Sequence, residues 1–354
     1  MLKKNSIAIC FCFFQLALFA QSDSAKAFSF SGYGEVYYSY DFSNPSNHEK
    51  SNFIYNHKKH NEINLNLAFA KVAYAKKNIR ANLAVMFGTY AHYNLAAEPI
   101  WARFIYEANL GVKISKKENI WIDAGILPSH IGFESAVGAD CWTLTRSMLA
   151  EGSPYFETGA KLSYTNKKET FSGALLVLNG WQRVIKPDYL HRPSFGLQLT
   201  YKPQSNFTIN YSNFIGTDKP DSLNAWRIFH DIYVVYEPIK QFGITAGLDI
   251  GTDKYDAKNY GVWYSPVVIL RYNINQKFRL AARGEYYVDK NQIIVTTNTS
   301  NGFQTFGASA NFDYQINDKL LWRIEGKGYF SKDPIFNFAQ KNNFSITTAL
   351  SVKL

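Results

Sequence analysis

Apolar and polar residues alternate along most of this 354-residue chain. From Phe344 to Leu354 every second residue is apolar or threonine, and Ser345, Thr347 and Lys353 are among those between. The same alternation runs through residues 103–114, 278–289 and 320–330. Successive side chains of a β-strand point to opposite faces, so each segment is predicted to be a strand with one apolar and one polar face.

The lengths of the connections between these segments are more specific for a fold class than the alternation itself. Short polar turns lie near 76–78, 115–119, 165–169, 203–206, 237–241, 273–276 and 317–319, and longer loops lie near 43–61, 88–102, 128–153, 180–193, 215–225, 252–260, 290–303 and 331–342. A soluble β-sandwich has no reason to alternate short and long connections throughout, whereas an outer-membrane barrel has turns at its periplasmic rim and loops outside. We therefore predict an all-β fold, a transmembrane antiparallel up-and-down β-barrel of about 16 strands.

Both ends of the predicted strand series suit closure of the barrel. The last apolar-alternating strand, ending at Leu354, can pair with the strand that begins near Phe28. Closure removes the strand edges whose backbone groups lipid would leave unsatisfied. Aromatic pairs such as Tyr286-Tyr287 and Tyr329-Phe330 lie near strand ends, as interfacial girdles do, although Tyr and Phe favour strands in general.

The N-terminus has the layout of a secretory signal peptide. Lys3 and Lys4 precede an apolar run that ends at Ala20, too short for a spanning helix. We expect residues 1–20 to be cleaved and residues 21–354 to form a single barrel domain, with Cys141 as its only cysteine and hence no intrachain disulfide.

The chain is basic, with a formal charge of +10 that becomes +8 when Lys3 and Lys4 are removed. An exported protein does not meet nucleic acid, so we expect no nucleic-acid partner. The expected partners are outer-membrane lipid and lipopolysaccharide and small hydrophilic solutes, and a homo-oligomer is left open.

The connection from Pro128 to Pro154 is too apolar for a loop in water, with Ile131, Phe133 and Leu144 among its residues. We expect it to fold inward after the fifth strand and narrow a lumen that sixteen strands make wide enough for water. The candidate constriction residues on this loop are Glu134, Asp140, Trp142, Arg146 and Glu151.

Several segments carry a resemblance to a known family. Residues 31–38 (SGYGEVYY), 61–68 (NEINLNLA), 121–135 (WIDAGILPSHIGFES), 142–147 (WTLTRS) and 179–183 (NGWQR) together resemble the OmpL-like β-barrel porins common in Bacteroidetes. Cys141 and Gly152 stand where that family would have Asn. The resemblance covers nearly all of the predicted mature chain and implies an outer-membrane porin, but it names no solute.

The polar strand faces carry charges that would be costly in hydrocarbon, roughly 2–4 kcal/mol for Arg or Lys at the bilayer midplane, so we expect them to face the lumen. They are Arg80, Arg103, Glu107, Glu157, Lys161, Asp231, Arg271, Arg279, Arg283, Glu285, Arg323, Glu325 and Lys327. A wet lumen is favoured over one plugged by paired charges, because side chains alone cannot fill so wide a barrel. Acidic residues of the Pro128–Pro154 loop would then face wall arginines such as Arg283 and Arg323 across a transverse field. His230 would face lipid, which the sequence does not explain.

The remaining chemical motifs have simple explanations. His57, His60 and Glu62 lie in a first loop expected to be exposed, with uneven spacing, so we expect no metal site there. Ser129 and His130 are adjacent and would face opposite ways on a strand, so we expect no catalytic residue and no enzyme; no cofactor motif is present. The predicted function is a passive diffusion channel, and the alternatives are a non-conducting surface-binding or structural barrel and a lipid-acting barrel enzyme.

Overall fold

The computed structural model describes residues 27–354, and the predicted signal peptide at residues 1–20 lies outside them. The described chain forms sixteen strands: β1 (Phe28–Asp41), β2 (Ile63–Lys76), β3 (Ile79–Phe87), β4 (Ile105–Lys113), β5 (Asn119–Pro128), β6 (Phe156–Thr165), β7 (Phe171–Leu178), β8 (Ser194–Gln204), β9 (Phe207–Gly216), β10 (Arg227–Ile239), β11 (Phe242–Lys254), β12 (Tyr260–Asn273), β13 (Phe278–Asp289), β14 (Phe303–Gln315), β15 (Leu320–Ser331) and β16 (Asn342–Lys353).

The helices are short and lie in the connections. They are α2 (Thr89–Asn94), α3 (Met148–Glu151) and the 3₁₀ helices η3 (Ala102–Phe104), η4 (Gly138–Asp140), η5 (Asp221–Leu223) and η6 (Asn337–Ala339). Within residues 27–354, no helix has the length and apolar character needed to cross a membrane.

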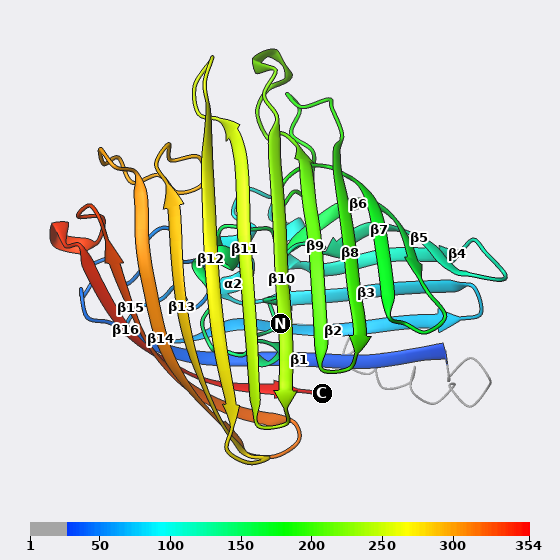
Figure 1. The fold of residues 1–354 in the computed structure, drawn as a ribbon, viewed down its shortest axis with the longest axis horizontal. Helices are drawn as coiled ribbons and strands as arrows, with labels where there is room; N and C mark the ends of the chain where they lie inside the picture. Colours follow the sequence, from blue (N-terminus) through cyan, green and yellow to red (C-terminus); the bar gives the residue numbers. More distant parts are fainter. Residues whose placement is uncertain (1–26) are drawn as a thin grey trace, which may run out of the picture.

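The sixteen strands form one closed antiparallel barrel, as the sequence predicts. Each strand pairs with its sequence neighbours, and β1 pairs with β16, where Tyr37 lies opposite Ala349. The strands of the front wall, β7 to β14, cross those of the back wall, β1 to β5, in Figure 1. Strand tilt in a closed barrel produces this crossing, because the two walls lean in opposite directions when seen from one side.

The two kinds of connection gather at opposite ends of the strands. Short turns lie at 77–78, 114–118, 166–170, 205–206, 240–241, 274–277 and 316–319, and the other connections lie at 42–62, 88–104, 129–155, 179–193, 217–226, 255–259, 290–302 and 332–341. Seven turns and eight loops therefore separate the strands, as predicted. We call the two rims of the barrel the turn end and the loop end.

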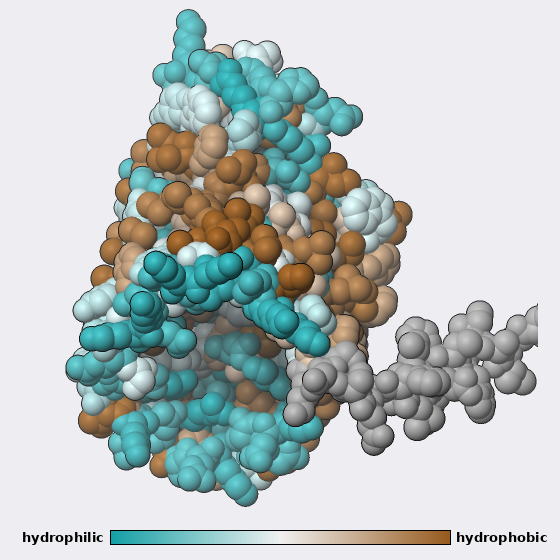
Figure 2. Space-filling view, turned by 90° about the vertical axis from the view of Figure 1, so that its right-hand side faces the viewer, coloured by the Kyte–Doolittle hydropathy of each residue, from teal (hydrophilic) through white to brown (hydrophobic). Residues whose placement is uncertain are grey.

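The outward face of the barrel is apolar. On β4, Leu110 is 69% exposed whereas its neighbour Asn109 is 6% exposed, because only outward residues are uncovered in the absence of lipid. Figure 2 shows the resulting belt of hydrophobic residues between hydrophilic ends. An apolar belt of this kind is the surface that lipid covers in a membrane barrel.

His230 is part of a polar pair on this outward face. Its Nδ1 lies 2.7 Å from the hydroxyl of Tyr211 on the neighbouring strand, and the two rings stack. The hydrogen bond gives both polar groups a partner, which lowers the cost of placing them outside the lumen.

The two faces of β3 should respond differently to the same charge. Leu83 lies in the middle of the strand and is 55% exposed outward, so Leu83→Arg should cost about 2–4 kcal/mol of folding free energy in lipid. The adjacent Asn82 lies on the polar face, where its amide donates to Asn109, so Asn82→Arg should cost much less. Urea titration of protein refolded in lipid vesicles measures both, and equal costs would contradict the facing of this strand.

Candidate functional site

The connection between β5 and β6, residues 129–155, packs against side chains on distant strands. Its backbone N–H groups at Leu144, Thr145 and Met148 donate to Asn311 on β14, Glu325 on β15 and Glu285 on β13, at 3.0, 2.5 and 2.5 Å. In the closed strand order β13 lies eight strands from β5 in both directions. The β5–β6 loop therefore makes its contacts on the wall opposite its own strands.

A buried ion-pair network joins this loop to that wall. The Arg283 guanidinium lies 2.8 Å from Glu325 and 3.6 Å from Glu134 of the loop, and it donates to the Thr145 carbonyl at 2.8 Å. Arg283, Glu325 and the neighbouring Glu285 are each at most 3% exposed. Buried charges persist only when paired and hydrogen-bonded, so these contacts make the loop and the wall one structural unit.

Arg323 and Lys327 on β15 extend the network. Arg323 pairs with Asp313 at 2.6 Å and donates to the carbonyls of Gly138 and Cys141 at 2.8 and 3.1 Å. Lys327 pairs with Glu285 at 2.8 Å and donates to the Arg146 carbonyl at 2.9 Å. A field across open space between loop acids and wall arginines was expected from the sequence. Instead, Arg283 pairs directly with Glu134 of the loop, and Arg323 is used by Asp313 of the wall and by loop carbonyls.

Arg146 does not face a lumen. It is 1% exposed, and its guanidinium donates to three carbonyls of its own loop, those of Ser135, Leu144 and Ala136, at 2.7, 2.8 and 3.1 Å. Its role in the structure is to hold the loop in its folded form. The prediction that its charge lines a constriction is wrong for this reason.

The loop acids also differ from one another in their surroundings. Glu134 accepts from the backbone N–H of Ser147, the N-cap of α3. Glu151 accepts from the N–H of Tyr55 at 2.9 Å, and burial raises the pKa of its carboxyl above the ordinary value. Asp140 alone of the three is well exposed, at 47% for the side chain, and pairs with Lys353.

Glycines on β11 provide the space into which loop aromatics fit. A Cβ on Gly243 would lie 2.6 Å from the Trp142 ring, and one on Gly247 would lie 2.8 Å from the Phe133 ring. Trp142 also stacks on the Arg271 guanidinium at 4.2 Å. The sequence interpretation missed these packing sockets, although the spacing of Gly243, Gly247 and Gly251 on the polar face of the strand was a signal for them.

The first loop, residues 42–62, is also folded in, contrary to the expectation that it is exposed. His57 is fully buried with Nε2 2.9 Å from Glu35 of β1, and His60 is 1% exposed. Phe53 packs against Phe303 on β14 and Tyr329 on β15. Burial lowers the pKa of His57, which favours the neutral ring.

The wall formed by β2 to β6 has cations that are partly open to water, paired with buried acids. Lys71 pairs with Glu107 at 2.6 Å and Arg80 with Asp123 at 2.5 Å, and the two cationic side chains are 26% and 36% exposed. Lys161 lies directly opposite Asp123 and is half-buried.

Three residues predicted to be lumen-facing charges, Glu157, Asp231 and Arg103, lie in surroundings other than an open lumen. The carboxylate of Glu157 accepts a hydrogen bond from His130, whose two ring nitrogens lie 2.6 Å from this carboxylate and 2.8 Å from the Asn213 carbonyl. Burial disfavours the charged ring of His130, but the carboxylate outweighs it and raises the pKa of His130. Asp231 is fully buried opposite Asp249 on β11. Arg103 is misassigned by the sequence interpretation, because it lies in η3 before β4 and donates to the loop carbonyls of Glu98 and Ala96.

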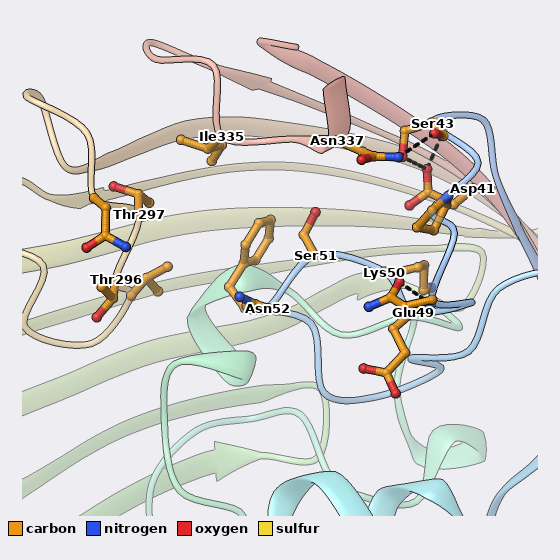
Figure 3. A pocket seen from close by; sticks show the side chains of 15 residues that line it. Asp41, Ser43, Glu49, Lys50, Ser51, Asn52, Thr296, Thr297, Ile335 and Asn337 are labelled. Carbon is orange, nitrogen blue, oxygen red and sulfur yellow. Dashed lines mark hydrogen bonds between the residues drawn. The ribbon is translucent and has the colours of Figure 1, made fainter. Parts of the chain in front are cut away.

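Polar cavities lie at both ends of the barrel. At the loop end, a cavity of about 300 Å³ lies between the first loop and the connections after β13 and β15. Figure 3 shows Asp41, Ser43 and Asn337 gathered on one side of it, with Thr296 and Thr297 on the other. At the turn end, a cavity of about 540 Å³ has Arg271 and Arg279 in its lining. Figure 2 shows a hollow with hydrophilic residues at its border below the apolar belt.

Among residues 27–354, no three His, Cys, Asp or Glu side chains are grouped so that they could hold a metal ion. The candidate site is a set of polar walls and cavities, in which some charged side chains are buried in pairs and others, such as Lys71 and Arg80, are partly open to water.

Comparison with known proteins relates this geometry to a family. The family model described as "Putative beta-barrel porin-2, OmpL-like" matches residues 27–354. No curated protein matches the sequence significantly.

Three solved structures illustrate the similarity of fold. The anion-selective porin from Comamonas acidovorans aligns with TM-score 0.61 and 7% identity, covering 93% of this chain and 99% of that one. The outer membrane channel DcaP of Acinetobacter baumannii gives 0.59 and 9%, with 92% and 97% covered, and Salmonella typhi OmpF gives 0.57 and 10%, with the same coverage. At these identities the likeness concerns the fold alone.

Filling the Gly243 socket should release the β5–β6 loop. A leucine there would overlap Trp142, and overpacking of about 1–3 kcal/mol corresponds to roughly tenfold faster exposure of the loop. Arg146 is the only trypsin site in residues 129–155, so cleavage after Arg146, followed by mass spectrometry, reports this release.

The matched control is Gly284→Leu on β13, where a Cβ would meet nothing within 4 Å. Its cleavage rate should equal that of the parent protein. A Gly243→Leu protein that is cleaved at the parent rate would show that the socket does not hold the loop.

Proposed function

This chain belongs to the family of OmpL-like β-barrel porins, and we propose that it is an outer-membrane channel for passive diffusion of small hydrophilic solutes. The observation that carries the proposal is the division of its inner wall. The cations Lys71 and Arg80 on β2 and β3 keep part of their side-chain surface open within a closed barrel of sixteen strands, although their acid partners are buried. Charges held open to water inside an apolar shell suit the passage of hydrated solutes.

The β5–β6 loop is the proposed constriction. Its contacts with β13, β14 and β15 support a position across the lumen, since those strands lie opposite its own. The charged residues proposed to act on a solute differ from those expected from the sequence. Arg146, Glu134 and Glu151 are used within the loop and its supports, so Asp140 and the charges of the open wall are left to act on a solute.

One set of observations favours a second candidate, a barrel that binds a partner at its surface and does not conduct. Both the first loop and the β5–β6 loop are packed inside with buried ion pairs, as in the plugged alternative. Electrical conductance distinguishes the two functions. A lipid-acting enzyme has no comparable support, and we propose that the protein is not an enzyme.

The proposal places the protein in the outer membrane, exported by a cleaved signal peptide at residues 1–20. The turns then face the periplasm and the loops face outside. Contact with lipopolysaccharide follows from that orientation, and assembly into a homo-oligomer is compatible with it.

Removing the core of the β5–β6 loop should widen the channel. Deletion of residues 136–147 takes away Arg146 but leaves the wall pairs Arg283–Glu325 and Arg323–Asp313 in place, so the wall stays electrically balanced. Single-channel conductance in a planar bilayer should rise severalfold. A deletion protein that folds, judged by its heat-dependent mobility in SDS gels, but conducts like the parent would exclude the loop as constriction. A parent protein that never conducts would favour the surface-binding function.

The orientation can be checked on intact cells. Asn47 and Asp256 are exposed residues of loop-end connections, and Lys117 and Lys167 are exposed residues of the turns, so single cysteines at these four positions are accessible to a reagent. The native Cys141 is buried and is first changed to serine. A membrane-impermeant maleimide should label the loop cysteines and spare the turn cysteines, and the reverse pattern would invert the proposed topology.

A further inference from the structure

The turn-end cavity is a strongly basic recess. It has a volume of about 540 Å³ and lies inside the ends of β10 to β14. Its lining includes Lys240, Arg271 and Arg279 together with the polar side chains of Asn273, Asn275 and Gln315. No carboxylate residue is part of this lining.

Arg271 is only partly neutralised. One of its terminal nitrogens lies 2.7 Å from Glu237, and the planar group stacks on Trp142. Its Nε is buried and has no hydrogen-bond partner in the structure. Stacking and the ion pair fix the orientation of the guanidinium, so the free N–H group points in a fixed direction.

Arg279 has a neutral partner where Arg271 has an acid. A terminal nitrogen of Arg279 donates to the side-chain oxygen of Gln315, and its Nε also lacks a partner. Within residues 27–354, no Asp or Glu oxygen lies within ion-pair distance of Arg279 or Lys240. The recess therefore holds three cationic groups beside two acids, Glu237, which pairs with Arg271, and Asp313, which lies opposite Arg279 but pairs with Arg323.

The register brings the two arginines together. Arg279 lies directly opposite Asn273, and Arg271 is two residues before Asn273 on the same face of β12. Diagonal neighbours of this kind have Cβ atoms about 7–8 Å apart, within reach of each other's long side chains. Two like charges at this separation repel, and an anion between them would replace that repulsion with attraction.

From this arrangement we propose that the turn-end recess binds a phosphate-type oxyanion, with Arg271 and Arg279 as its main ligands and Lys240 adding long-range attraction. Two guanidinium groups and an ammonium group in the lining match the several acceptor oxygens of a tetrahedral dianion. In the channel this site would concentrate phosphate or a phosphorylated solute at the periplasmic mouth. That role rests on the proposed function, whereas binding itself does not.

Calorimetric titration of the full chain, folded in detergent micelles, with inorganic phosphate tests the binding. Each charge-assisted hydrogen bond is worth about 1.5–3 kcal/mol, so Arg279→Gln should weaken binding by about tenfold or more. Arg279→Lys, which keeps the charge, should weaken it less. Arg279 is substituted rather than Arg271, because changing Arg271 would also remove its contact with Trp142 and so disturb the β5–β6 loop.

Lys290→Gln is the matched control, since it removes the same charge from an exposed position at the loop end. It should bind phosphate as the parent does. Absence of binding by the parent, equal binding by the parent and Arg279→Gln, or equal weakening by Lys290→Gln would overturn the proposal.

A second measurement separates this site from the channel function. Phosphate added at the turn end should reduce the KCl conductance of the parent in a planar bilayer and have less effect on Arg279→Gln. If the protein binds phosphate in solution but never conducts, the phosphate site is supported and the channel function is overturned. If it conducts but does not bind phosphate, the channel function is supported and the phosphate site is overturned.

Discussion

Pairing of every backbone polar group in hydrocarbon is the constraint on which the rest of the structure depends. Lipid offers no hydrogen-bond partner, so a strand that crosses it must be paired on both edges. The pairing of β1 with β16 meets this requirement by closing the sheet. Closure in turn divides each strand into a lipid face and an enclosed face. Residues as close as Leu110 and Asn109 thereby come to lie in opposite environments.

The enclosed face raises a second problem, since sixteen strands surround more space than their own side chains can fill. In one half of the barrel the chain fills that space with its own loops. Four cations, Arg146, Arg283, Arg323 and Lys327, lie there with four acids, Glu134, Glu285, Asp313 and Glu325. Each group is nearly buried, so the balance of charge and the saturation of donors by loop carbonyls are what make the burial tolerable. The loop and the wall support each other, because loop carbonyls accept hydrogen bonds from wall cations and wall acids accept hydrogen bonds from loop N–H groups.

The sequence carries the fold in strictly local signals, and these were sufficient to predict the strands, the order of turns and loops, and the closed barrel. A two-residue alternation and the length of a connection can be recognised without knowledge of distant contacts. The interior could not be predicted in the same way. Whether Arg146 faces water or its own loop depends on carbonyls that tertiary folding places around it. The facing of Arg103 could not be predicted without knowing that β4 begins only after this residue. The burial of the first loop could not be predicted from its polar residues, because His57 is buried only through its pairing with a buried acid, Glu35.

The uneven filling of the barrel has a consequence for how charge can act on a solute. Ionised groups in the filled half are paired at contact distance, so their fields largely cancel over the width of the lumen. The net charge of the chain is thus a poor guide to selectivity, because it counts groups that a solute never senses. The incompletely covered groups include Asp140 on the β5–β6 loop, Lys71 and Arg80 on the open wall, and Arg271 and Arg279 at the turn end, and we propose that a solute meets these groups. Four of the five are cationic, and these cations are only partly matched by Glu107, Asp123 and Glu237. Screening over about 10 Å in physiological salt confines their influence to the water beside them. Selectivity in such a barrel is therefore decided by which charges the loops leave uncovered.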